Sequence, residues 1–491
     1  MKPTSFKFKS TKLTSTLLFF WILTVFASYW GSDILSATVS GLGEIYPFRI
    51  LLPLTCCLFL LAAFRQKINL WKHSSLLEKL CYLLIVALLV YGAFSLRLAI
   101  DFSFSFRRLF NLCFDLAFFF LAIQLCRDAR FMRSTVITVG GTTALMCLLG
   151  IYEIVFGGIF RNIYDEVRIV PLLYGDFQLP TVTFTNTNDY ATAIVFSLAV
   201  VLLYWGYHYT SQRKNLWIPL VAVPVCFFLV YMTTSRLAVI CMWIILAGLA
   251  AFFFLQAKSH RWIPVFFLVI YLAVAFVSDF RYIKTASEKF ADDIEDYIEY
   301  RSAVAEVGEG ALEKVPFPKF KIIRPGINLS DELFNVDEFG NRVFDDRYSG
   351  GVRLRLLKHS FACFFDSFGL GVGLGNTEQL AKLNKVAAGG NIWAIHCFVA
   401  RIIGDLGIFS LLPLALIILK LLAMLVKALR FHIKARNKCG IALLLLVFSS
   451  TIIYPFMSTA SSDAQDSLAM WLYLGLLVLF AVHLQAGKPE E

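Results

Sequence analysis

Arg236 stands inside an apolar stretch, YMTTSRLAVICMW, at residues 231–243. An ionised guanidinium at the centre of a bilayer costs about 2.5–3.5 kcal/mol on insertion scales. No Asp or Glu lies within seven positions of Arg236 on either side, so its own segment offers no carboxylate to pair with. We therefore predict that Arg236 binds an anionic group supplied by another part of the chain or by a ligand.

Further arginines recur near the outer ends of apolar runs. A guanidinium stays charged in any environment, and its planar fork matches phosphate oxygens. A cluster of them beside lipid predicts an anionic lipid headgroup, most simply a diphosphate. The alternative is that each one extends to phospholipid headgroups or pairs with a carboxylate. We favour that alternative for Arg49, Arg97 and Arg355. Both interpretations stay open for Arg107 and Arg108. Arg353 is the last of the arginines considered for this role.

His396, in NIWAIHCFVARIIGDLGIF, lies where a long polar segment returns to an apolar run. A lone histidine is more often structural than catalytic. A neutral imidazole can, however, accept a proton from a sugar hydroxyl. Transfer of a sugar from a lipid diphosphate needs little more, because the leaving group is good and arginines stabilise its charge.

The amino-acid composition indicates what kind of protein carries these residues. The chain is 58% hydrophobic and 16% charged, whereas soluble domains carry about 25% charged residues. The net charge of +11 does not indicate nucleic-acid binding, because residues 279–391 hold 15 Lys/Arg against 18 Asp/Glu, a net of −3. The positive excess lies in short loops, as membrane topology requires. We predict an all-α polytopic membrane protein that binds no nucleic acid.

Twelve apolar segments have roughly the length of a membrane span. Lys and Arg gather in alternate loops, at 65–79, 127–135, 208–215, 256–261 and 427–440, whereas 31–44 and 457–467 have none. This places both termini in the cytoplasm. We divide the chain into spans 1–9 (1–278), an extracytoplasmic loop domain (279–395) and spans 10–12 (396–491). The segments are 13–30, 45–64, 80–100, 109–126, 136–156, 190–207, 216–233, 237–255, 262–278, 396–426, 441–456 and 468–484.

The tenth segment is too long for one straight span, at about 46 Å for a continuous helix. Gly404, Gly407 and Pro413 lie inside it, so we predict a short interfacial helix that then turns into the membrane. In the outer loop, helical spacing predicts an amphipathic helix over 284–306 and another after Gly351. GLGVGLGN, at 369–376, lacks the flanking elements and the Lys-Ser/Thr of a phosphate loop. We expect instead a flexible turn that approaches another segment closely.

Four short motifs resemble the O-antigen ligase and O-antigen polymerase family. These are membrane glycosyltransferases of the GT-C type that take a glycan from undecaprenyl diphosphate. The resemblance spans most of the chain, with twelve spans and a large outer loop between the ninth and tenth. The motifs are FTNTND at 184–189, TTSRL at 233–237, SGGVRLRLLKHSF at 349–361 followed by GLGVGLGN, and AIHCFVARIIGDLGIFSLL at 394–412.

The resemblance implies roles for individual residues. Arg236 and Arg353 would bind the donor diphosphate, and His396 would act as the base toward the acceptor hydroxyl. Three departures from the family pattern are Cys397 for asparagine, Asp405 for glutamate, and Ser367-Phe368 for Asn-Pro. Arg355 competes with Arg353 for its role. Further candidates are Arg107 and Arg108 for the diphosphate, and Asn186, Asn188 and Asp405 for the acceptor or for structural support.

We therefore expect a glycosyltransferase of the cytoplasmic (inner) membrane that works on its outer face without metal or other cofactor. Its partners would be an undecaprenyl-diphosphate-linked donor and an acceptor, either lipid A-core (ligase) or another lipid-linked chain (polymerase); the sequence does not choose between them. One alternative is a transporter or flippase, since Asp115 and Glu153 are acids within spans. Another is a non-enzymatic assembly protein that uses the outer loop for docking.

Overall fold

The structure is a computed structural model of the whole chain. It describes most of the apolar segments and the second half of the outer loop. The predicted helix at 284–306 lies outside the described residues, and so does the rest of 274–333. The described residues are 8–30, 37–39, 43–72, 74–156, 169–172, 175–178, 180–184, 187–212, 216–233, 235–256, 262–273, 334–336, 342–344, 349–386, 394–395, 397–460 and 468–485.

Helices make up nearly all of the described chain, and short antiparallel hairpins occur in the connections. The hairpins are β1 (Ala37–Val39) with β2 (Gly43–Ile45), β3 (Ile169–Leu172) with β4 (Gly175–Gln178), and β5 (Phe334–Val336) with β6 (Arg342–Phe344). The first helices are α1 (Lys12–Ala27), α2 (Pro47–Arg65), α3 (Leu76–Ser95) with the 3-10 turn η1 (Leu96–Leu98), α4 (Phe102–Leu125), α5 (Ala129–Phe156), α6 (Thr187–Gln212), α7 (Trp217–Met232) and α8 (Arg236–Gln256). A helix at Trp262–Ala273 follows. The later helices are α10 (Ser349–Asp366), α11 (Asn376–Leu383), α12 (Phe398–Leu406), α13 (Ile408–Lys434), α14 (Lys438–Ala460) and α15 (Leu468–Gln485).

The apolar runs form a bundle of helices, because lipid offers no partner for backbone N–H and C=O groups outside a helix. Among the described residues, eight helices are long and apolar enough to cross a membrane, and shorter apolar helices occupy the remaining predicted segments. The prediction of a helical membrane protein is confirmed. The count of twelve spans and the division into three domains stay predictions. The hairpins at the turns were not predicted.

The start of the chain and two of the Lys- and Arg-rich loops that were predicted to be cytoplasmic, 65–79 and 127–135, meet at one end of the bundle. The backbone N–H of Phe8 donates to Asp128 Oδ2 at 3.0 Å, which joins the start of the chain to the α4–α5 turn. Arg127 Nε donates to Glu78 Oε1 at 2.7 Å, which joins that turn to the first turn of α3. These contacts agree with the predicted alternation of loops, while the side of the membrane on which this end lies stays a prediction.

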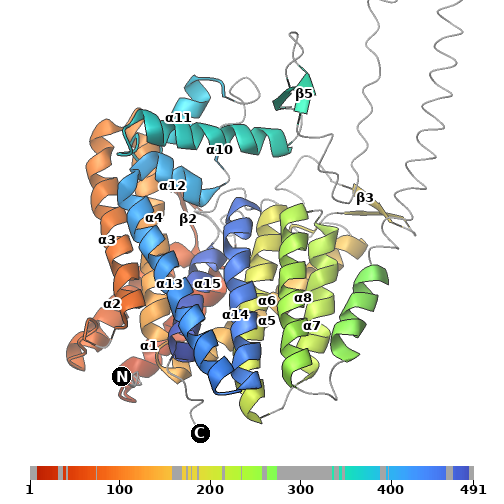
Figure 1. Cartoon of the computed structure of the whole chain (residues 1–491). Helices are drawn as coiled ribbons and strands as arrows, with labels where there is room; N and C mark the ends of the chain where they lie inside the picture. Colours follow the sequence, from red (N-terminus) through yellow and green to blue (C-terminus); the bar gives the residue numbers. More distant parts are fainter. Residues whose placement is uncertain are drawn as a thin grey trace, which may run out of the picture.

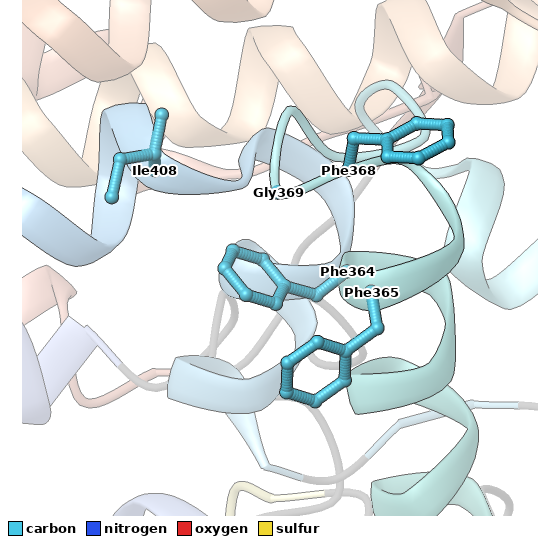
Figure 2. A pocket seen from close by; sticks show the side chains of 5 residues that line it. All are labelled: Phe364, Phe365, Phe368, Gly369 and Ile408. Carbon is cyan, nitrogen blue, oxygen red and sulfur yellow. The ribbon is translucent and has the colours of Figure 1, made fainter.

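Helices α10, α11 and α12 lie at the opposite end, where α10 runs across the ends of the spans (Figure 1). The predicted break in the tenth apolar segment is confirmed. α12 ends at Leu406, Gly407 takes φ +56° and ψ −137°, and α13 starts at Ile408. Ile408 lies near the turn that follows α10 (Figure 2). α10 begins at Ser349, whereas its start was predicted to lie after Gly351.

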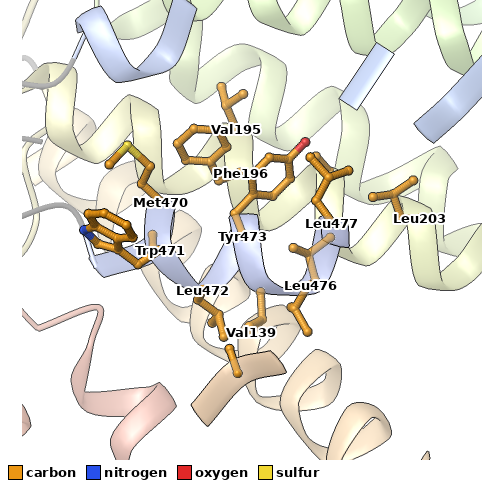
Figure 3. Close-up of a cluster of buried hydrophobic side chains, with 14 of the residues drawn as sticks. Val139, Val195, Phe196, Leu203, Met470, Trp471, Leu472, Tyr473, Leu476 and Leu477 are labelled. Atoms are coloured by element: carbon orange, nitrogen blue, oxygen red, sulfur yellow. The ribbon is translucent and has the colours of Figure 1, made fainter. Parts of the chain in front are cut away.

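The last helix, α15, supplies much of the core. The Phe196 and Tyr473 rings stack with centroids 4.5 Å apart, and Trp471 packs against Phe119 of α4. Figure 3 shows these α15 side chains directed into the space between neighbouring helices. Aromatic pairs of this kind contribute about 0.5–1.5 kcal/mol beyond the area that they bury. The core therefore holds α4, α6 and α15 together below the outer layer, which is formed by α10, α11 and α12.

Gly407→Ala should destabilise the protein, because a Cβ there would collide with the Gly369 carbonyl and Ala rarely adopts this backbone conformation. We expect a loss of at least about 1–3 kcal/mol, measured by thermal unfolding in detergent. Gly141→Ala is the matched control, since its Cβ meets nothing within 4 Å in the middle of α5, and it should be neutral or stabilising. Equal melting temperatures for both variants would contradict the assigned break.

Candidate functional site

The glycine-rich turn after α10 uses all its backbone N–H groups within the chain. Gly371 has φ +85°, and a Cβ there would lie 2.5 Å from the Asp405 carbonyl oxygen, so only glycine fits this approach to α12. A phosphate loop needs free N–H groups, and residues 369–377 offer none. The acceptors, from Gly369 to Thr377 in order, are Phe364 O, Ser367 O, Ser367 Oγ, Gly404 O, Asp405 O, Ser95 Oγ, Asp405 Oδ2, Gly373 O and Asp405 Oδ1.

This turn also closes the end of α12. The N–H groups of Val372 and Gly373 donate to the carbonyls of Gly404 and Asp405, which are among the last carbonyls of that helix. On its other side, Ile408 N–H donates to Gly369 O at 2.8 Å. The predicted close approach is present, but these hydrogen bonds fix the turn, so the expectation of a flexible segment is corrected.

Asp405, a predicted acceptor or support residue, is fully buried and contacts the start of α11. Its carboxylate accepts hydrogen bonds from Gly375 N–H at 2.9 Å, Thr377 N–H at 3.0 Å and Thr377 Oγ1 at 2.6 Å. Burial raises the pKa of the Asp405 carboxyl to about 6, and these hydrogen bonds act in the opposite direction. A carboxylate at a helix N-terminus is favourable. These contacts agree with the support role.

Glu378 binds two guanidinium groups and was missed by the sequence analysis. Its side chain is fully buried and accepts from Arg108 Nη2 at 2.7 Å, from Arg401 Nη1 at 3.4 Å and from the N–H of Ile395 at 3.0 Å. This cluster joins α4, α11, α12 and the residues just before α12. Two features of the sequence could have indicated this pairing. Glu378 lies in the first helical turn after a glycine run, and Arg401 lies inside an apolar helix.

The predicted arginines on α2, α3 and α4 differ in their surroundings. Arg108, with a side chain 12% exposed, pairs with Glu378 and lies over the Phe104 ring. Its neighbour Arg107 is exposed, and its Nε donates to Ser103 O at 3.4 Å. Arg49 donates to Asn111 at 2.6 Å, and exposed Arg97 lies over a Phe94 ring. Arg108 therefore pairs with a carboxylate, as the alternative interpretation proposed. The guanidinium group of Arg107 remains accessible.

Arg353 lies in the first turns of α10 and is partly buried. Burial lowers the pKa of its guanidinium, while the charge of Asp189 raises it. Its Nε is shielded from solvent and has no hydrogen-bond partner in the described part of the chain. Asp189 and the partly exposed Asn188 lie in the first turn of α6, so a charge in one sequence motif acts on the guanidinium group of another. Arg355, two residues on, is also partly buried.

Three predicted residues are not placed by the structure. His396 and Asn186 lie outside the described residues, and so does the side chain of Arg236, although α8 begins at that residue. The neighbours of His396 are anchored, because Ile395 binds Glu378 and the Cys397 carbonyl accepts from Arg401 N–H. A shared cavity for Arg236, Arg353 and His396 stays a prediction. Within the described ranges, no three His, Cys, Asp or Glu residues group as metal ligands would.

Asp405→Asn should change the pH dependence of stability. Because the folded state holds the Asp405 proton more tightly than the unfolded state, its contribution is complete below about pH 4 and is lost as the pH rises through about 6. When the pH is lowered from about 7 to about 4, the free energy of unfolding of the wild type should therefore rise by up to about 3 kcal/mol relative to that of Asp405→Asn. Thermal unfolding across this range measures the gap. Asp366→Asn, which removes an exposed carboxyl group on α10, is the matched control in the same series.

Glu378→Gln should be strongly destabilising, because it removes a buried carboxylate that is paired with two largely buried guanidinium groups. Removing one partner of a buried ion pair costs about 3–5 kcal/mol. If the pairing is responsible, the double variant with Arg401→Gln should lose less than the sum of the two single variants. Strict additivity in thermal unfolding would show that Glu378 and Arg401 do not interact.

No protein-family model matches the chain. The chain is similar to the teichuronic acid biosynthesis protein TuaE of Bacillus subtilis (strain 168), with 22% identity over 450 residues. The aligned region covers 89% of this chain and 79% of that protein. The likeness therefore extends through the spans and the outer segments together, and is not confined to one motif.

Proposed function

We propose that this protein is a glycosyltransferase of cell-envelope polysaccharide biosynthesis in the cytoplasmic membrane. The observation that carries the proposal is the similarity to a teichuronic acid biosynthesis protein over most of the length of both chains. The donor would be a saccharide on undecaprenyl diphosphate, and the acceptor a sugar hydroxyl at the outer face. In this arrangement the end that carries α10–α12 faces outward, and both termini are cytoplasmic.

The chemistry assigned to Arg353 follows from its surroundings. A guanidinium that is partly withdrawn from water interacts more strongly with a phosphate than an exposed one. Its shielded Nε, which has no hydrogen-bond partner in the described part of the chain, is a donor that a diphosphate oxygen could use. Arg236, at the start of α8, would supply a second guanidinium. Together they would hold the donor and stabilise the negative charge that grows on the diphosphate as it departs.

The transfer itself needs one proton acceptor. The acceptor hydroxyl oxygen forms a bond to the anomeric carbon while the bond from that carbon to the phosphate oxygen breaks. The hydroxyl proton passes to His396, and the lipid diphosphate leaves as an anion held by the arginines. Attack opposite the leaving group inverts the anomeric centre. Asn188 and Asn186 would orient the acceptor, and Asp405 would support α11.

Polymerase and ligase share this chemistry and differ in the acceptor. A polymerase would extend one lipid-linked chain with another, giving a ladder of products, whereas a ligase would give one transfer to a separate acceptor such as lipid A-core. The length distribution of products from a purified reaction therefore assigns the acceptor class.

Arg353→Ala should reduce transfer from a lipid-linked oligosaccharide by about 100-fold or more, the usual effect of removing a group that stabilises transition-state charge. Arg353→Lys should recover little of that loss, because an ammonium group cannot replace the planar fork. Lys358→Ala is the matched control, since Lys358 is an exposed cation on the same helix and should keep full activity. The assay uses purified protein and quantifies elongated glycan.

Full activity of Arg353→Ala, with unchanged melting temperature, would contradict the assignment of Arg353. His396→Ala and Arg236→Ala test the other two roles in the same assay. A wild-type protein that moves lipid-linked glycan across vesicles but forms no new glycosidic bond would instead support the transporter alternative.

A further inference from the structure

The last turns of α10 expose phenylalanine side chains on one side. Phe361 and Phe365 lie about one turn apart on α10 and are 41% and 70% exposed. Phe368, in the turn that follows the helix, has φ +53° and is 96% exposed. The other side of the helix, including Leu356, Ser360 and Cys363, is buried. Neighbouring apolar side chains left exposed to this extent mark a binding surface.

A groove of about 430 Å³ lies beside this aromatic side. It is lined by Phe364, Phe365, Phe368, Gly369 and Ile408, without a charged side chain (Figure 2). In Figure 2 the Phe364 ring points toward Ile408, and Phe365 lies below it. The lining suits a hydrocarbon chain better than a sugar or a phosphate.

The groove lies at the level where a membrane span begins. Ile408 is the first residue of α13, a 27-residue apolar helix, and its N–H is bonded to Gly369 O. Exposed apolar residues continue from Ile408 along α13 through Phe409 and Leu412. Since exposed residues of a span face lipid, the groove opens onto the lipid-facing surface at the edge of the hydrocarbon region.

We propose that this groove takes an acyl chain of a phospholipid in the adjacent leaflet, so that the C-terminal half of α10 is an interfacial membrane anchor. A helix that lies across the bundle end with phenylalanines on one side has the form of an in-plane amphipathic helix. Phenylalanine is one of the side chains that such helices bury at the boundary between headgroups and acyl chains.

The anchor would set the height of Arg353. Twelve residues separate Arg353 from Phe365 on one continuous helix, a distance of about 18 Å along its axis. With one end held in the lipid headgroup region, the guanidinium stays near the level at which a lipid-borne diphosphate lies. This consequence rests on the proposed function, whereas the lipid groove does not.

Photocrosslinking tests the proposal without requiring activity. The photoreactive analogue p-benzoylphenylalanine is placed at position 365, at 368, or at the exposed control Asn384 after α11, and the full-length protein is reconstituted in phosphatidylethanolamine–phosphatidylglycerol vesicles. Figure 1 shows α11 at the top, above α10. We expect phospholipid adducts, identified by mass spectrometry, at least about tenfold more abundant at 365 and 368 than at 384.

Each other outcome overturns the proposal. Phospholipid adducts no more frequent than at 384 would show that this surface is aqueous, and crosslinked dimers would show that a second copy covers it. In a parallel arm with added polyprenyl phosphate, preferential adducts with that lipid would assign the groove to the donor chain. Unchanged melting temperatures of the labelled proteins establish that the fold is intact.

Discussion

The buried carboxylate of Glu378 is the contact on which the outer layer depends. A single unpaired charge in such a site would be severely destabilising, and two guanidinium groups from different helices remove that penalty. Their geometry fixes α4, α11 and α12 relative to one another. Because Glu378 also accepts the Ile395 N–H, the same contact holds the residues that lead to His396.

A second constraint is the end of α12, which Gly407 alone separates from α13. The last residues of α12 are buried, so their carbonyls need hydrogen-bond partners within the protein. The glycine turn supplies their donors, and it can do so because Gly371 and Gly407 lack side chains where two backbones meet. The glycine run is thus explained by backbone contact between two segments. Phosphate binding is not needed to account for it.

The helices, the break at Gly407 and the start of α10 could be predicted because they follow from local patterns of apolar residues, glycines and charge. The partner of Arg108 could not, since Glu378 lies 270 residues away and no local pattern connects them. The sequence located Asp405 but did not reveal that its carboxylate caps α11. It also predicted a flexible turn where tertiary hydrogen bonds hold a rigid one. Convergence of Arg236, Arg353 and His396 depends on side chains outside the described residues and stays a prediction.

The hydrogen bonds between the α3–α4 corner and the glycine turn also have a consequence for biogenesis. Ser95, Ile100 and Arg108 are synthesised well before Leu374, Asn376 and Glu378, their partners across about 270–280 residues. During insertion this corner remains in contact with water or with the insertion machinery, because these long-range partners have not yet been synthesised. These hydrogen bonds form when the later helices dock. Folding of the N-terminal half is therefore complete only after the C-terminal half has been inserted.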